Sequence, residues 1–318
     1  MNNNVIKTII LFFILIVIIG CNSKQTKVIE IEYDKAIIPE GIAINSENGK
    51  LYLSSLHKEK IVEYDLKNKK AEDLTTSKEY GFKSGVGMIV KDNKLFALSG
   101  DMTKIQSSIL VVIDLETNEL LHSYTVNDTV SHFMNDLTIS ENNQIYITDT
   151  RRHIVYKLDY PSGEIENFMI DDQIKYPNGI SISENGEKLF VDSNTEGIRI
   201  IDIDSKKILN KKNDYTSNSG VDGLKYYKGN LYAVRNFGDD NNQHGFIKLV
   251  LSKNQEEIVE VVPVLLGHEK LNVPTTFDIF KDYAYFIANS QMKNLDQEKN
   301  QIINPDSLTN TFIIKVRL

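Results

Sequence analysis

The chain has a single cysteine, no tryptophan and only 6 prolines among its 318 residues. With one cysteine, no disulfide can form within the chain, so a disulfide-stapled domain is excluded and the fold needs a hydrophobic core of its own. The low proline content excludes collagen-like and proline-rich chains. Hydrophobic residues make up 41% of the sequence and charged residues 25%, which is typical of a globular protein.

Positive charge is also scarce. Lys and Arg total 36 against 44 Asp and Glu, for a formal net charge of -8, and the basic residues are scattered along the chain. Nucleic acids and anionic lipid surfaces are recognised by clustered Lys and Arg. The sequence therefore predicts no nucleic-acid partner.

Only the N-terminus contains a long hydrophobic run, Ile9–Ile19, preceded by the single charged side chain of Lys7. This run is short for a membrane span, which needs about 20 residues, but it suits a signal peptide. It ends in Ile18-Ile19-Gly20-Cys21, which resembles a bacterial lipobox. One interpretation is a lipoprotein signal peptide over residues 1–20, with lipid on Cys21; the other is an uncleaved anchor helix with an incidental cysteine.

Both interpretations predict an exported protein held at a bacterial membrane, facing the periplasm or the exterior. Residues 21–27 are mostly polar and indicate a short tether before the folded domain.

After residue 20, one short pattern recurs six times. Each copy has a first residue, usually followed by Gly or Asp, then an apolar-x-apolar run, a polar turn and a second strand. The first residues of the copies lie 43 to 53 residues apart and are Glu40, Val86, Asn135, Asn178, Asp222 and Thr275. A period of this length, with several short strands in each unit, is typical of a β-propeller.

Chain length alone suggests two domains, but the repeat predicts a single all-β domain, a six-bladed β-propeller over residues 28–318. The last copy reaches Leu318 without room for a fourth strand. The run Val28–Tyr33 has the alternating pattern of a strand. We therefore predict that an N-terminal strand completes the last blade and closes the ring.

The innermost strand of each propeller blade starts near the central channel, so the six first residues should converge there. Two of them are carboxylates, Glu40 and Asp222, and two are carboxamides, Asn135 and Asn178. Calcium takes six to eight oxygen ligands of these kinds. Without Cys or His in the ring, zinc and copper are disfavoured. The ring therefore predicts one Ca²⁺ in the channel, with other divalent ions as alternatives.

Four motifs resemble the metal-binding motifs of one family of six-bladed propellers, the senescence marker protein (regucalcin)/gluconolactonase family, which is related to diisopropyl fluorophosphatase and the paraoxonases. They are Pro39-Glu40-Gly41, Met134-Asn135-Asp136, Pro177-Asn178-Gly179 and Val221-Asp222-Gly223. The resemblance covers the chain from about residue 28 to the C-terminus. It implies calcium-dependent hydrolysis of lactones or related esters. It also implies that Glu40, Asn135, Asn178 and Asp222 are the metal ligands, and that Asp222 acts as general base or nucleophile.

Three further residues are candidates for lining the substrate pocket. Val86 stands where the paraoxonases present a His, which argues against a His-assisted mechanism at that position. Thr275 either hydrogen-bonds a ligand or simply begins a strand. His132, three residues before Asn135, either lines the pocket mouth or is an ordinary surface or loop histidine.

Two functions agree with these features. One is a membrane-anchored, exported, Ca²⁺-dependent hydrolase of a lactone or related ester. The other is a non-catalytic propeller that binds a small ligand or a protein and uses Ca²⁺ only as a structural ion, since a fold by itself does not determine function.

Overall fold

The computed structural model describes residues 26–102, 107–127, 130–216, 220–236 and 240–318. The predicted leader over residues 1–20, Cys21 and most of the tether lie outside these ranges. Within them, none of the helices has the length and apolar character needed to cross a bilayer.

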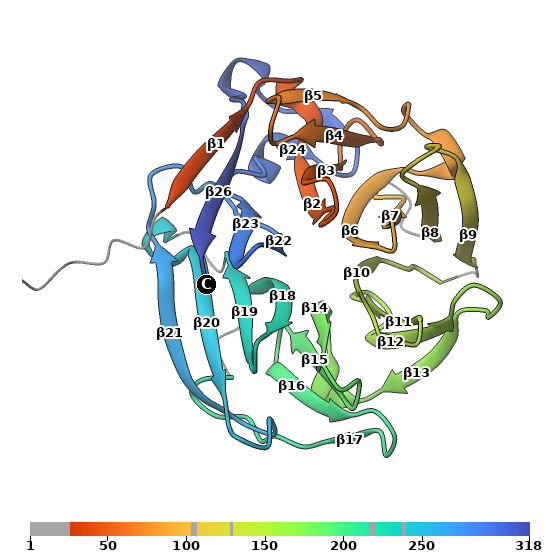
Figure 1. The fold of residues 1–318 in the computed structure, drawn as a ribbon, viewed down its shortest axis with the longest axis vertical. Coiled ribbons are helices and arrows are strands. Elements are labelled where there is room, and N and C mark those ends of the chain that lie inside the picture. The colour runs from red at the N-terminus through yellow and green to blue at the C-terminus, as the bar shows by residue number, and fades with distance from the viewer. Residues whose placement is uncertain (1–25, 103–106, 128–129, 217–219, 237–239) are drawn as a thin grey trace, which may run out of the picture.

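Six four-stranded antiparallel sheets surround a central axis, which confirms the six-bladed β-propeller (Figure 1). Blade 1 is β2 (Pro39–Ile44), β3 (Lys50–Ser55), β4 (Ile61–Asp65) and β5 (Lys70–Asp73). Blade 2 is β6 (Ser84–Lys91), β7 (Lys94–Gly100), β8 (Ser107–Asp114) and β9 (Leu120–Asn127). Blade 3 is β10 (Met134–Ile139), β11 (Gln144–Asp149), β12 (Ile154–Asp159) and β13 (Glu166–Ile170).

Blade 4 is β14 (Pro177–Ile182), β15 (Lys188–Ser193), β16 (Gly197–Asp202) and β17 (Lys207–Ile208). Blade 5 is β18 (Val221–Tyr227), β19 (Asn230–Arg235), β20 (Gly245–Leu251) and β21 (Ile258–Leu266). Blade 6 is β22 (Phe277–Phe280), β23 (Tyr283–Ile287), β26 (Thr311–Arg317) and β1 (Lys27–Ile31). The first strand of every blade lines the central channel (Figure 1).

The two ends of the described chain share blade 6. β1 is its outermost strand and pairs with β26 from Lys27 opposite Lys315 to Ile31 opposite Thr311. The predicted closure by an N-terminal strand is therefore confirmed. Joining both chain ends in blade 6 closes the ring of blades, and outside the channel the remaining free strand edges of the blades lie on the outer rim.

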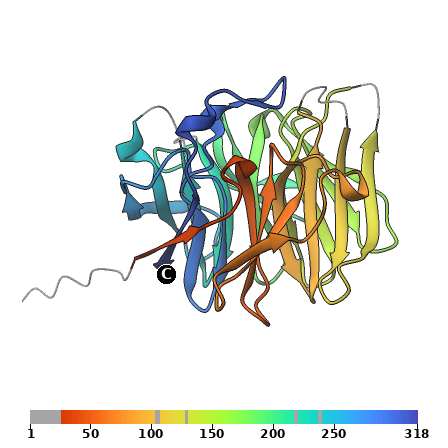
Figure 2. The same cartoon turned by 90° about the horizontal axis from the view of Figure 1, so that it is seen from above.

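Short elements connect the strands. Six 3₁₀-helices are described: η1 (Lys35–Ile37), η2 (Glu79–Gly81), η3 (Asp172–Ile174), η4 (Asn241–Gln243), η5 (Met292–Asn294) and η6 (Pro305–Ser307). A small hairpin of β24 (Leu295–Asp296) and β25 (Gln301–Ile302) lies between β23 and β26. Its segment contacts the start of blade 1, because the Gln291 amide donates to the Lys35 carbonyl at 3.4 Å. The insertion thus lies on the face where the inner strands begin (Figure 2).

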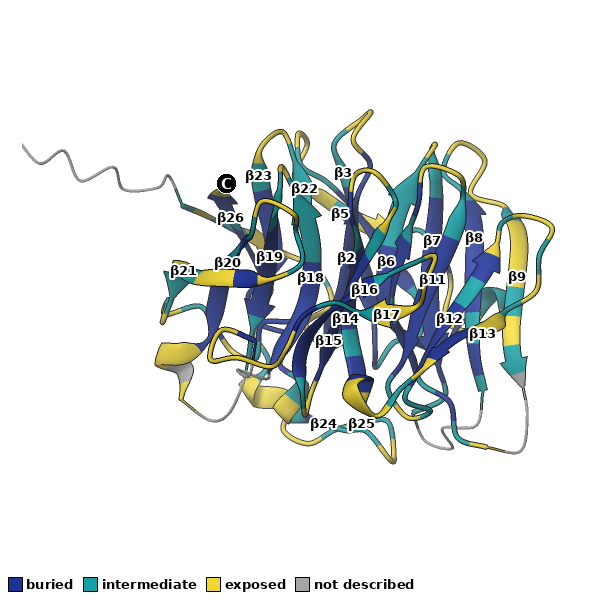
Figure 3. Ribbon diagram, turned by 90° about the horizontal axis from the view of Figure 1, so that it is seen from below, coloured by how far each residue is buried: buried dark blue, intermediate teal, exposed yellow. Residues whose placement is uncertain are grey.

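The hydrophobic core is divided among the contacts between adjacent blades. The described residues form six buried clusters, each centred on one pair of neighbouring blades. Both faces of each sheet are therefore covered, and most exposed residues lie in the connecting turns (Figure 3). This arrangement leaves the start of the inner strands as the place where polar side chains from several blades can meet.

Candidate functional site

The predicted ring residues of five blades lie at β-bulges. In each case the register between the first and second strands shifts, so that two residues of the inner strand lie opposite one residue of the second strand. The first of the two is the ring residue: Glu40, Val86, Asn135, Asn178 and Asp222. Bulges occur next to active sites, where they redirect a side chain that regular pleating would point elsewhere.

The second residue of the bulge is a Gly in most blades, and the structure shows why a larger residue does not fit there. A Cβ on Gly41 would lie 2.0 Å from the carbonyl oxygen of Val86, and one on Gly179 would lie 2.3 Å from that of Asp222. The backbone of the next blade thus occupies the space that a side chain would need. In blade 3 this position holds Asp136, whose carboxylate enters the channel wall and accepts hydrogen bonds from Leu137 and Ile180.

Glu40 and Asp222 bring two buried carboxylates together in the channel, with exposed fractions of 5% and 7%. Burial raises the pKa of Glu40 well above its usual range, and the charges of Asp222 and Asp136 raise it further. Burial also raises the pKa of Asp222 to about 6, although hydrogen bonds from Asn236 and Asn178 act in the opposite direction. Two carboxylates at such a site favour a bound cation or a proton.

Two oxygen atoms in the ring are buried without a hydrogen-bond partner. They are Oε2 of Glu40 and Oδ1 of Asn178. The amide nitrogen of Asn135 donates to the Thr150 hydroxyl at 3.0 Å. The amide oxygen of Asn135 takes no part in this hydrogen bond. A buried oxygen that lacks a donor is costly, and a hard cation satisfies several such oxygens at once.

The donor set suits calcium better than zinc. In the described ranges, no group of three or more His, Cys, Asp and Glu side chains is placed to hold a metal ion, and the ring itself combines two carboxylates with two amides. Zinc prefers Cys and His, whereas calcium accepts carboxylate and amide oxygens together with water. Glu40, Asn135, Asn178 and Asp222 are the residues that would hold the ion.

Residues 38–235 match the model of the SMP-30/gluconolactonase/LRE-like family. The chain belongs to this family. No match was found among curated protein sequences.

Solved structures resemble this SMP-30/gluconolactonase-like chain in fold. A gluconolactonase from Xanthomonas campestris is 13% identical with a TM-score of 0.61, over 92% of this chain and 89% of that one. A calcium-binding regucalcin from Agrobacterium tumefaciens is 14% identical with a TM-score of 0.59, over 88% and 91%. Virginiamycin B lyase from Staphylococcus aureus is 12% identical with a TM-score of 0.59, over 92% and 99%.

Two residues that the repeat pattern did not reveal support the ring of this SMP-30/gluconolactonase-like propeller. Asn236, directly after β19, donates to Oδ2 of Asp222 at 2.7 Å and to the Pro274 carbonyl at 2.9 Å. Thr150, directly after β11, accepts from Asn135 and donates to the Pro177 carbonyl at 2.7 Å. Each therefore fixes the ring residue of its own blade against the next blade. Their shared position after the second strand is the only signal in the sequence.

Val86 and Thr275 occupy the two remaining ring positions. Val86 is 1% exposed and belongs to a hydrophobic cluster shared by blades 2 and 3. Thr275 is fully buried, and its hydroxyl donates to the Glu40 carbonyl at 2.8 Å, as does that of Thr276 at 2.7 Å. Both threonines thereby fix the backbone that carries Glu40.

His132 lies in the connection before β10, as a loop histidine would, but it is not at the surface. It is 1% exposed, and its Nδ1 lies 2.9 Å from Oδ2 of Asp149 and 3.2 Å from the Tyr156 hydroxyl. Asp149 also accepts from the backbone amides of Arg151 and Arg152, at 3.1 and 3.0 Å. The spacing between His132 and Asp149 gave no hint of this pair, because the two residues meet only when the chain enters and leaves the first hairpin of blade 3.

Asp192 is a further buried carboxyl group beside the ring. In blades 1 and 3 the equivalent register positions hold Ser54 and Thr148, whose hydroxyls donate to the carbonyls of Val86 and Asn178 at 2.8 and 2.7 Å. Both oxygens of Asp192 are buried without a partner. Burial raises the pKa of Asp192 well above its usual range, and the charge of Asp222 adds to this. A protonated Asp192 offers a donor and an acceptor, as the two hydroxyls do.

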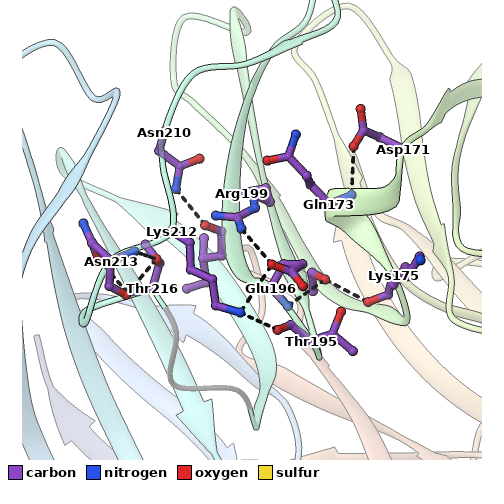
Figure 4. A network of polar contacts seen from close by, with 12 residues as sticks. Asp171, Gln173, Lys175, Thr195, Glu196, Arg199, Asn210, Lys212, Asn213 and Thr216 are labelled. Atoms are coloured by element: carbon purple, nitrogen blue, oxygen red, sulfur yellow. Dashed lines mark hydrogen bonds and ion pairs between the residues drawn. The ribbon is translucent and has the colours of Figure 1, made fainter.

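A network of polar contacts holds the loop that leads into β14 and Asn178 (Figure 4). The Ser193 hydroxyl donates to the Lys175 carbonyl at 2.8 Å and accepts from the Glu196 amide. Glu196 in turn contacts Lys212 at 3.3 Å and the buried Arg199 at 3.5 Å. These contacts connect the approach to Asn178 with β16 and the segment after β17.

A separate cavity of about 530 Å³ lies at the other ends of the inner strands. Its wall includes the last residues of β10, β14 and β18 and the turns that follow them, among them Ser140, Ser183 and Tyr226. Since the ring residues lie at the beginnings of the same strands, this cavity and the ring are at opposite ends of the channel.

Proposed function

We propose that the chain is a Ca²⁺-dependent hydrolase of a lactone or related ester, with the metal in the channel. The observation that carries the proposal is the pair of unpartnered, buried oxygens of Glu40 and Asn178 beside Asp222. Membership of the SMP-30/gluconolactonase/LRE-like family supports this reaction class.

Asp222 is the proposed catalytic residue. Its carboxylate can accept the proton of a water molecule while that water attacks the carbonyl carbon of the lactone. The ring C–O bond then breaks, and the proton goes to the leaving oxygen to give a hydroxy acid. Asn236 fixes one carboxylate oxygen of Asp222 at 2.7 Å, which orients the other toward the channel. When bound, calcium supplies positive charge that stabilises developing negative charge on the substrate oxygen.

We also propose that the protein is exported and lipid-anchored through Cys21. β1 enters blade 6 at Lys27, as the outermost strand of that blade, and Lys27 lies level with Asp278 through Lys315 and Tyr285. Six residues from Cys21 to Lys27 can span at most about 20 Å. An anchor at Cys21 would therefore hold the outer strand of blade 6 close to the membrane.

The second candidate is a non-catalytic ligand- or protein-binding propeller with a structural Ca²⁺. It is favoured by Val86, because an apolar residue in the cluster between blades 2 and 3 replaces a polar group at one ring position. It is also favoured by Thr275, whose hydroxyl bonds the Glu40 backbone.

The deciding experiment is hydrolysis of a lactone and ester panel by the metal-stripped and calcium-loaded protein and by its Asp222→Ala variant. We expect hydrolysis that requires calcium and disappears in the variant, while its unfolding stays cooperative. Asp204→Ala, at an exposed position outside the ring, is the control and should keep full activity. Hydrolysis that persists in Asp222→Ala would refute the catalytic assignment, and calcium binding without hydrolysis would favour the second candidate.

A further inference from the structure

Below the ring, three charged side chains from three different blades meet in the channel. Asp136 comes from β10, Lys225 from β18 and Asp278 from β22. Lys225 and Asp278 have side-chain exposures of 22% and 18%, and Nζ of Lys225 lies 3.5 Å from Oδ1 of Asp278. The charges of Lys225 and Asp278 both act on Asp136, in opposite directions. Asp136 also acts on the ring carboxylates Glu40 and Asp222, so it interacts with the ring as well as with the Lys225–Asp278 ion pair.

The two carboxylates make matching contacts. Asp136 accepts from the amide of Leu137 at 2.9 Å and from the amide of Ile180, in blade 4, at 3.3 Å. Asp278 accepts from the amide of Ile279 at 2.9 Å and from the amide of Ile44, in blade 1, at 2.8 Å. Each carboxylate thus joins its own inner strand to that of the next blade.

Lys225 is the group of opposite charge in this arrangement. Two carboxylates held in a channel wall repel each other and are poorly hydrated, so each needs a cation or a proton. A metal ion could provide the positive charge, but the ammonium group of Lys225 already provides it from within the chain. Asp136 also follows Asn135 directly, and the two residues together form the bulge of blade 3. A shift of Asp136 would therefore also move Asn135.

We propose that Lys225 is a positioning residue whose ammonium group is the internal counter-charge for Asp136 and Asp278, so that no metal ion binds in the channel below the ring. This inference goes beyond the proposed function. It assigns the layer below the ring and does not require the protein to be a hydrolase.

The test is calcium titration by calorimetry, with thermal melts, on the metal-stripped folded domain and its Lys225→Met and Lys225→Arg variants. Wild type and Lys225→Arg should bind one ion per chain. Lys225→Met should bind two, and its melting temperature should fall by several degrees in chelator and recover in calcium. Lys60→Met is the matched control: its side chain is 13% exposed and pairs with Asp73 at 2.7 Å, away from the channel, so it should not add an ion.

A Glu40→Gln background separates this inference from the proposed function. Glu40→Gln should weaken the ring site, whereas Glu40→Gln combined with Lys225→Met should still bind the added ion. If wild type binds no calcium but Lys225→Met binds one ion, the inference stands and the calcium-dependent function fails. Unchanged stoichiometry and melting temperature in Lys225→Met would overturn the inference. It would also be overturned if Lys225→Met failed to fold even in calcium, because calcium should replace the lost charge.

Discussion

The charge on Asp222 should destabilise the protein when calcium is removed. Burial raises the pKa of Asp222 from 3.8 to about 6 in the folded protein. Because one pKa unit corresponds to about 1.4 kcal/mol, ionising this group in the folded state costs about 3 kcal/mol relative to the unfolded chain. The folded state holds the proton more tightly, so this cost is absent below about pH 4. It develops as the pH rises toward 6 and then stays constant.

Asp222→Asn removes the charge but keeps an oxygen that can accept from Asn236, so it isolates this effect. In chelator at pH 7.5, the variant should be about 3 kcal/mol more stable than wild type, a rise in melting temperature of roughly 6 to 12 °C. The difference should vanish near pH 4. In calcium it should reverse, because an ion that binds only the folded wild type stabilises it. Equal melting temperatures of the two proteins in chelator at pH 7.5 would refute the reasoning.

Three other predictions test the blade contacts, the ring and the anchor. Gly41→Ala places a Cβ 2.0 Å from the Val86 carbonyl oxygen and should lower the free energy of unfolding by about 3 kcal/mol or more, measured in urea; a loss below about 1 kcal/mol would contradict the close contact between blades. Asn178→Ala should weaken calcium binding at least tenfold by calorimetry, and an unchanged affinity would remove Asn178 from the site. Cys21→Ser should release the protein from the membrane fraction of expressing cells; retention there would favour an uncleaved anchor helix.

The repeat in the sequence was sufficient to predict the number of blades, closure by an N-terminal strand and the residues at the six ring positions. These features are local and periodic. A first residue, an apolar alternation and a turn recur in every unit, with a Gly or Asp after the first residue in five of the six, and each blade needs them for its own inner strand. The Gly after Glu40 and after Asn178 is also part of this repeated pattern. It is needed because the backbone of the next blade leaves no room for a side chain there.

Only the tertiary structure showed which groups meet across blade boundaries. Asn236 bonds both Asp222 and the backbone before blade 6, and Lys225 meets Asp278 from a strand 53 residues away. Such partners are set by the register shift at each bulge and by how closely one blade packs against the next. Each of these side chains, taken alone, fits an ordinary strand or turn. The sequence therefore determined the six blades and the ring positions, whereas packing between blades determined which charged groups lie around the ring.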